Sequence, residues 1–270
     1  MVVQHNLSAM NTNRQMGVVT SALQKSTEKL SSGYKINRAG DDAAGLSISE
    51  KMRSQIRGLN KASDNAQDGI SLIQVAEGAL NETHSILQRM NELATQAAND
   101  TNTSVDRQSI KDEIEQLNEE LDRISTTTQF NKQDLLKGGF SRKLQVGALK
   151  GQTMDVKISL AVSAKGLNVS AVEVSNNAKA GTAMKSIQDA IESVSKQRSK
   201  LGAIQNRLEH TINNLDTNAE NTQAAESRIR DTDMADEMVQ YSKNNILSQA
   251  GQSMLAQANQ QTQGVLSLLG

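Results

Sequence analysis

Apolar residues recur in alternating steps of three and four between Gly45 and Asn99, which is the pattern of a coiled-coil helix. This stripe consists of Ile48, Met52, Ile56, Leu59, Ala66, Ile70, Ile73, Leu80, Leu87, Ala94 and Ala98. A second stripe, from Leu72 to Ala97, runs beside the first, so the helix needs cover on two sides. At about 1.5 Å per residue the helix would reach roughly 80 Å, longer than a compact domain of this size is wide. The pattern predicts a rod.

Two further segments carry the same helical period. A turn after Asn99 leads into a helix that begins at Ser104 or Asp106, and this short connection predicts antiparallel packing against the first helix. From Ala183 to Gln223 the heptad pattern returns and predicts a third long helix. The expected fold is therefore mainly α, with long antiparallel helices.

Between these helices the period falls to two. Apolar and polar residues alternate from Leu144 to Ala148 and again from Met154 to Val162, which predicts a β-hairpin that turns at Lys150–Gln152. The Ser-, Asn- and Gly-rich segment 165–181 is expected to be a surface loop.

The two ends of the chain carry weaker apolar patterns, diluted with Asn, Gln, Ser and Thr. Each buries too little to offset an ordering cost of about 1–2 kcal/mol per residue, so we expect disorder until a partner supplies surface. The expected regions are paired terminal helices at 1–33 and 230–270, a connector at 34–44 and a rod core at 45–229. The hairpin and loop occupy about 140–181, and Asp41 or Asp42 is expected to cap the long helix.

The composition removes several classes of protein. The chain has no proline to break a helix and no cysteine for disulfides or thiolate metal sites. The net charge of -1, with interspersed signs, gives no electrostatic footprint for nucleic acid or an anionic membrane. No segment is as apolar and as long as a membrane span, which needs about eighteen consecutive apolar residues. We also expect no cleaved signal peptide at the start.

Catalytic chemistry has little support in the sequence. The three histidines His5, His84 and His210 are far apart, and neither an HExxH motif nor a Gly-rich phosphate loop occurs. We therefore expect no enzyme activity and no catalytic, cofactor-binding or metal site.

Several runs resemble the signatures of bacterial flagellins. At the N-terminal end these are LSSGYKINRAGDDAAGL at 30–46 and NAQDGISLIQVAEGAL at 65–80. At the C-terminal end they are LGAIQNRL at 201–208, AESRIRD at 225–231 and QANQQTQGVLSLL at 257–269. The resemblance covers nearly the whole chain and departs in the middle. Many flagellins insert variable outer domains where this chain has only the hairpin and loop, so it is similar to a minimal flagellin.

This resemblance implies a structural subunit that polymerises into the extracellular flagellar filament for motility. It implies export of the unfolded chain through the flagellar type III channel, and an inner domain of paired terminal helices that lines the filament channel. The implied partners are further copies of the chain, an export chaperone at the C-terminal region, and the filament cap and hook-associated proteins. Insertion into a membrane is not expected. The implied subunit contacts are Leu7, Met10, Leu23, Leu30, Met238, Leu255, Val265 and Leu269.

The resemblance also implies recognition by vertebrate Toll-like receptor 5. The segment Gln88–Gln96 is similar to the motif that this receptor binds, and the matching positions are Arg89, Leu93 and, on the second helix, Glu113. The alternative interpretation is that Leu93 belongs to the core and that Arg89 and Glu92 are solvated surface charges.

Two other functions remain open at this point. A protein of the hook–filament junction would have similar termini. A secreted coiled-coil effector or adhesin would form a stable oligomeric rod and would survive trimming of its ends.

Overall fold

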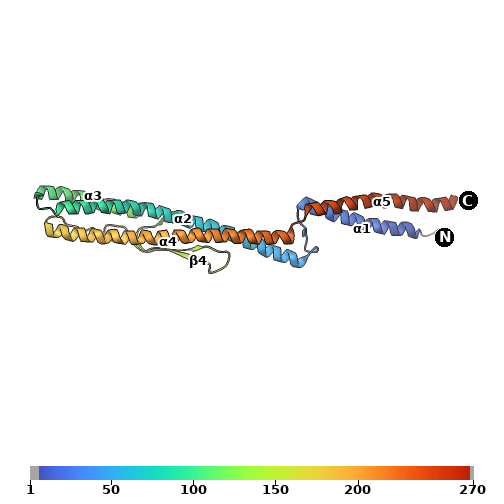
Figure 1. The fold of residues 1–270 in the computed structure, drawn as a ribbon, viewed down its shortest axis with the longest axis horizontal. Helices are drawn as coiled ribbons and strands as arrows, with labels where there is room; N and C mark the ends of the chain where they lie inside the picture. Colours follow the sequence, from blue (N-terminus) through green and yellow to red (C-terminus); the bar gives the residue numbers. More distant parts are fainter. Residues whose placement is uncertain (1–5, 268–270) are drawn as a thin grey trace. The chain divides into compact units, whose positions relative to one another are not determined.

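A computed structural model describes the backbone of residues 6–267 and the side chains of residues 6–261 (Figure 1). The chain forms two compact units, one from residues 1–54 and 221–270 and the other from residues 55–220. We call them the terminal unit and the central unit and describe each by itself.

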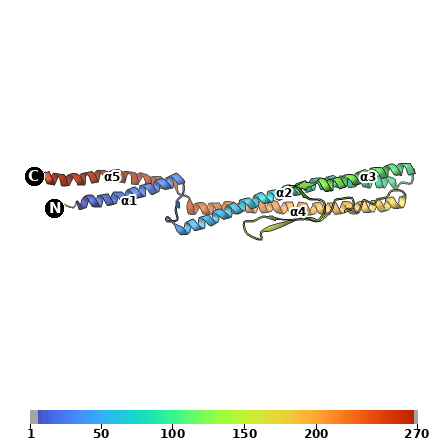
Figure 2. The ribbon, with the colours of Figure 1, turned by 180° about the vertical axis from the view of Figure 1, so that it is seen from behind.

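The central unit is built on three helices. These are α2 (Ala43–Ala97), α3 (Ser104–Thr127) and α4 (Asn177–Arg230), of which α2 and α4 continue into the terminal unit. Both views show the three helices side by side over the part they share (Figures 1 and 2). Their buried side chains confirm the predicted heptads from Leu59 onward, whereas Ile48, the first predicted position, is 46% exposed. The largest fully buried residues on these helices are Ile73, Leu80, Leu87, Met90, Ile114, Leu121, Ile187, Leu201 and Leu208.

The start of α3 is fixed by a capping box. The Thr103 N–H donates to Asp106 Oδ2 at 2.9 Å, and the Asp106 N–H donates to Thr103 Oγ1 at 3.4 Å. These reciprocal bonds satisfy backbone donors that have no partner within the helix. The predicted start at Ser104 is confirmed.

The predicted β-hairpin is also confirmed. Strand β3 (Phe140–Gln145) pairs antiparallel with β4 (Thr153–Ile158), and Met154, Val156 and Ile158 turn into the core. A smaller hairpin of β1 (Gln129–Phe130) and β2 (Gln133–Asp134) was not predicted. Its two turn residues, Asn131 and Lys132, both have positive φ, which is the geometry of a two-residue hairpin turn.

The expectation of a surface loop over 165–181 was wrong in two respects. Helix α4 already begins at Asn177, because Asn176 Oδ1 accepts a hydrogen bond of 2.8 Å from the Lys179 N–H and caps the first turn. In addition, Leu167, Val169 and Val174 are buried. A segment rich in Ser, Asn and Gly can still anchor itself through a few widely spaced apolar side chains.

The terminal unit pairs α1 (Leu7–Ser32) with α5 (Met234–Ser267), as predicted (Figures 1 and 2). The Asn6 side chain caps α1 at its start and also donates to the Ala258 carbonyl of α5 at 3.0 Å. At the other end of α1, Lys29 lies 3.5 Å from Glu237. The two contacts fix an antiparallel register along the pair.

The connector between α1 and α2 is held by its own polar groups. Gly33 ends α1 with φ 75°, a left-handed conformation that glycine adopts without strain. Asp42 is the residue that caps α2, because its Oδ1 accepts from the Gly45 N–H at 2.9 Å. Asp41 binds within the connector instead, and the Arg38 N–H is the main cause that lowers the pKa of its carboxyl group.

Candidate subunit-contact and recognition surfaces

The terminal unit has almost no apolar core of its own. Among its described residues, Ile36 and Ala258 are the buried hydrophobic side chains. Small and polar residues fill much of the α1–α5 contact. A Cβ added at Gly251 would meet Met16 Cγ at 3.8 Å, and Ser26 is buried. This helix pair therefore gains little from hydrophobic burial by itself.

The apolar side chains of this unit lie instead on its surface. Of thirteen exposed large hydrophobic residues in the described part of the chain, ten belong to the terminal unit. They are Leu7, Met10, Val18, Ile48, Met234, Met238, Val239, Ile246, Leu247 and Met254. Such a concentration of exposed apolar residues is typical of surfaces that bind another molecule.

The exposed residues form stripes. On α1, Met10 and Val18 follow Leu7 by three and eleven residues, so the three share one face, and Met16 at the α5 contact lies on the opposite face. On α5, the pair Val239 and Ile246 and the pair Leu247 and Met254 are each spaced by seven residues, which places each pair on one stripe. The exposed apolar stripes thus lie on faces of α1 and α5 that do not contact the other helix of the pair.

The subunit contacts implied by the resemblance divide into three groups. Leu7, Met10 and Met238 are exposed. Leu23, Leu30 and Leu255 are half-buried. The Val265 side chain and Leu269 lie outside the described residues.

Sequence reasoning missed several exposed residues of the terminal helices. They are Val18, Val239, Ile246, Leu247 and Met254. The signal that reveals them is an apolar side chain outside the heptad positions that face the partner helix.

A clasp ties the connector to the end of α4 within the terminal unit. The Arg230 guanidinium lies over the Tyr34 ring, 4.6 Å from its centroid, and donates to Glu50 Oε1 at 3.1 Å. The Lys35 N–H donates to the Arg230 carbonyl at 2.7 Å, and the Thr232 N–H donates to the Gly33 carbonyl at 3.0 Å. These contacts set the path of the chain on both sides of the connector.

The residues implied for receptor recognition lie on α2 and α3. Arg89 Nε donates to Glu113 Oε1 at 2.9 Å, and Arg89 also pairs with Glu92 at 3.3 Å. The hydrogen bond to Glu113 is the main cause that raises the pKa of Arg89. All three charged side chains are exposed, whereas Leu93 is only 2% exposed. Leu93 therefore lies in the core beneath this surface, in agreement with the alternative interpretation for that residue.

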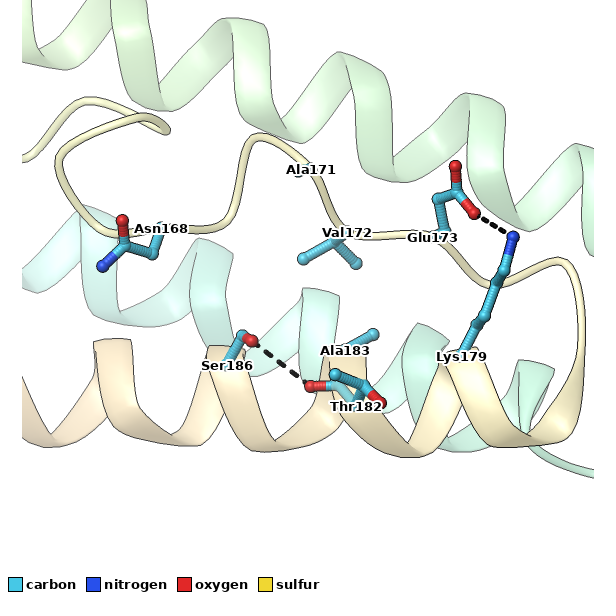
Figure 3. A pocket seen from close by; sticks show the side chains of 8 residues that line it. All are labelled: Asn168, Ala171, Val172, Glu173, Lys179, Thr182, Ala183 and Ser186. Carbon is cyan, nitrogen blue, oxygen red and sulfur yellow. Dashed lines mark hydrogen bonds and ion pairs between the residues drawn. The ribbon is translucent and has the colours of Figure 1, made fainter.

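A shallow pocket of mixed polar and apolar lining lies between the segment before α4 and the first turns of α4 (Figure 3). Its rim carries an ion pair between Glu173 and Lys179, and Ser186 Oγ donates to the Thr182 carbonyl at 3.3 Å. The hydrogen bond from Lys179 is the main cause that lowers the pKa of Glu173. The only carboxylate of the pocket is thus held charged and paired, which is not the arrangement of a general acid or base.

The described residues also contain no group of three His, Cys, Asp or Glu side chains that could hold a metal ion. Each helix in the described part of the chain lacks an apolar stretch of the length needed to cross a membrane.

Comparison with known proteins matches both helical ends of the chain to one family. The bacterial flagellin N-terminal helical region matches residues 3–141, and the bacterial flagellin C-terminal helical region matches residues 184–269. These two matches span most of the chain. The chain therefore belongs to the bacterial flagellin family.

Individual relatives match over their full length. A flagellin of Halalkalibacterium halodurans is 56% identical and one of Bacillus subtilis is 52% identical, each over 100% of both chains. The crystal structure of Bacillus cereus flagellin is 34% identical, with a TM-score of 0.51 over 60% of this chain and 94% of that one. A putative flagellar hook-associated protein from Vibrio parahaemolyticus shares the fold, with a TM-score of 0.62 at 16% identity over 71% of this chain and 100% of that one.

Proposed function

We propose that this chain is a structural, non-catalytic subunit that polymerises with further copies of itself into the flagellar filament. The observation that carries the proposal is the terminal unit, which leaves nine large hydrophobic side chains exposed on a pair of helices with almost no core. Neighbouring copies that bury these stripes would supply the missing apolar contacts. The full-length similarity to flagellins supports the same occupant.

Seeded assembly tests this function. Short filament fragments are added to purified chain, and elongation is followed by electron microscopy. Ile246→Ser removes an exposed apolar group from α5 and should slow elongation, whereas Ile246→Leu keeps the apolar group at the same position and should elongate like the unchanged protein. Chain that stays soluble in the presence of seeds would contradict the proposal and favour a junction protein or a coiled-coil effector.

In the proposed function the two units have different roles in the filament. The terminal unit would form the inner domain that lines the filament channel, and the central unit would surround it. Export of the unfolded chain through the flagellar type III channel suits a sequence without cysteine and with weakly apolar ends. In this scheme the C-terminal region binds an export chaperone, and the filament cap and hook-associated proteins contact the ends of the extracellular polymer.

We also propose that Toll-like receptor 5 recognises the surface around Arg89 and Glu113. The support is that both side chains are exposed and mutually oriented by a hydrogen bond of 2.9 Å, so they present a fixed pair of charges. Arg89→Ala should weaken binding of the receptor ectodomain and leave the helical content unchanged. Arg123→Ala, on the same helix as Glu113 and in an exposed ion pair with Glu120, is the matched control. Equal binding by both variants would exclude this surface.

A further inference from the structure

The methionines of the chain are distributed unevenly between the surface and the core. Four thioether side chains are exposed on α1 and α5: Met10 at 64%, Met234 at 48%, Met238 at 51% and Met254 at 59%. In the central unit, by contrast, Met90 is fully buried and Met154 is 8% exposed. Small oxidants in the solvent therefore reach the sulfur atoms of the terminal helices and not these two core sulfur atoms.

Each exposed methionine belongs to one of the apolar stripes. Met10 follows Leu7 by three residues, Met234 and Met238 are four apart, and Met254 follows Leu247 by seven. These spacings place each pair on one side of its helix. The accessible thioethers thus lie in the same surface that is proposed to contact neighbouring copies.

We propose that these four methionines make assembly sensitive to peroxide, because their oxidation in the free chain prevents its addition to a filament. The inference rests on the proposed function. A sulfur lone pair attacks one oxygen of hydrogen peroxide, the S–O bond forms and the O–O bond breaks. The released oxygen takes up the remaining proton and leaves as water. Sulfur loses two electrons and the peroxide gains them, so methionine becomes its sulfoxide.

Oxidation to the sulfoxide makes burial of these side chains in a subunit contact unfavourable. It replaces a flexible apolar group by a polar one whose oxygen needs a hydrogen-bond donor when it leaves water. An apolar contact with a neighbouring copy offers no such donor. The central unit should keep its fold under the same treatment, because Met90 and Met154 are shielded and its third methionine, Met184, is half-buried at the edge of the core. Subunits already in a filament should resist oxidation, since the contact covers the same sulfur atoms.

The first experiment maps the modification. Free chain and assembled filaments are exposed to dilute hydrogen peroxide, digested and analysed by mass spectrometry. In the free chain Met10, Met234, Met238 and Met254 should form sulfoxide at least about tenfold faster than Met90 and Met154, and assembly should remove most of this difference. Equal rates for core and terminal methionines in the free chain would overturn the proposal.

The second experiment measures seeded elongation before and after peroxide. Oxidised chain should elongate at least about tenfold more slowly, and treatment with methionine sulfoxide reductases of both stereospecificities should restore the rate. A variant with Leu at all four positions should elongate at the same rate before and after peroxide. The repair step tests the idea even where that variant fails to assemble.

The outcomes separate the two proposals. Untreated chain that elongates, together with oxidised chain that elongates equally fast, would overturn the peroxide sensitivity alone. Untreated chain that never elongates would overturn the filament function and this inference with it.

Discussion

Tyr34 at the start of the connector and Arg230 at the end of α4 are far apart in sequence and stack in the fold, with the guanidinium carbon 4.6 Å from the ring centroid. The same guanidinium pairs with Glu50, and the Arg230 side chain is largely buried. A planar cation is well suited to this site because it binds a ring face and a carboxylate at once. The clasp holds the connector against α4.

Loss of this stacking should loosen the connector. In Arg230→Ala, the amides of Lys35 and Thr232 should exchange about tenfold faster with solvent, because a partly buried cation–π contact contributes about 1–2 kcal/mol. Arg230→Lys keeps the charge but not the planar group. The exchange rates of these amides in Arg230→Lys should therefore lie between those of Arg230→Ala and those of the unchanged protein. Hydrogen exchange followed by mass spectrometry makes this measurement, and unchanged protection in Arg230→Ala would show that the clasp is dispensable.

Removal of either terminal helix should abolish assembly without unfolding the central unit. The central core lies between residues 66 and 208, so variants that lack 1–30 or 234–270 keep every residue of it. Circular dichroism should show helical, soluble protein, and seeded electron microscopy should show no elongation. Filaments of normal length from either truncation would contradict the role given to the terminal unit.

A cavity in the heptad seam should destabilise the central unit. Leu80 is completely buried on α2, so Leu80→Ala should lower the free energy of unfolding by about 2–5 kcal/mol. Val105, which is 72% exposed on α3, gives the control, and Val105→Ala should change that free energy by less than about 0.5 kcal/mol. Urea unfolding measures the free energy of both variants. Similar losses of free energy in the two would show that Leu80 does not belong to the core.

The capping box of α3 should respond to acid. The hydrogen bond from the Thr103 hydroxyl is the main cause that lowers the pKa of Asp106 below its ordinary value of 3.8. A lowered folded-state pKa stabilises the folded chain above the unfolded value, and this contribution disappears as the pH falls through the folded value. Carboxyl resonances in a nuclear magnetic resonance titration should show the pKa rise in Thr103→Ala and stay low in Thr103→Ser. An unchanged pKa in Thr103→Ala would remove the hydroxyl as its cause.

The long helices and the larger hairpin were predictable because their periods are strong. Steps of three and four around Leu80 and Leu87 and the alternation from Met154 to Ile158 have few alternative structures. The turn at Asn131 and Lys132 was missed because the strands beside it are only two residues long, too short to show a period.

The lack of a regular period also explains why the burial of the segment before α4 was not predicted. Leu167, Val169 and Val174 carry no regular spacing, and their burial depends on where the neighbouring helices leave room.

The candidate surfaces were only partly predictable. Leu7, Met10 and Met238 were named through the family resemblance, and the structure places all three as exposed apolar residues on the terminal helices. Arg89 and Glu113 are 24 residues apart, and their hydrogen bond depends on the register of α2 against α3. Leu93 presented a different difficulty. It stands in the motif beside exposed charges and yet faces the core.

The most direct test of the central claim is hydrogen exchange of the same chain, measured first as free subunit and then in seeded filaments. The account predicts that amides of α1 and α5 exchange rapidly in the free subunit and become protected in the filament, because neighbouring copies cover their apolar stripes. Amides of the central core around Leu80 and Leu201 should be protected in both states. Equal protection of α1 and α5 in both states would contradict the claim that neighbouring subunits stabilise the terminal unit.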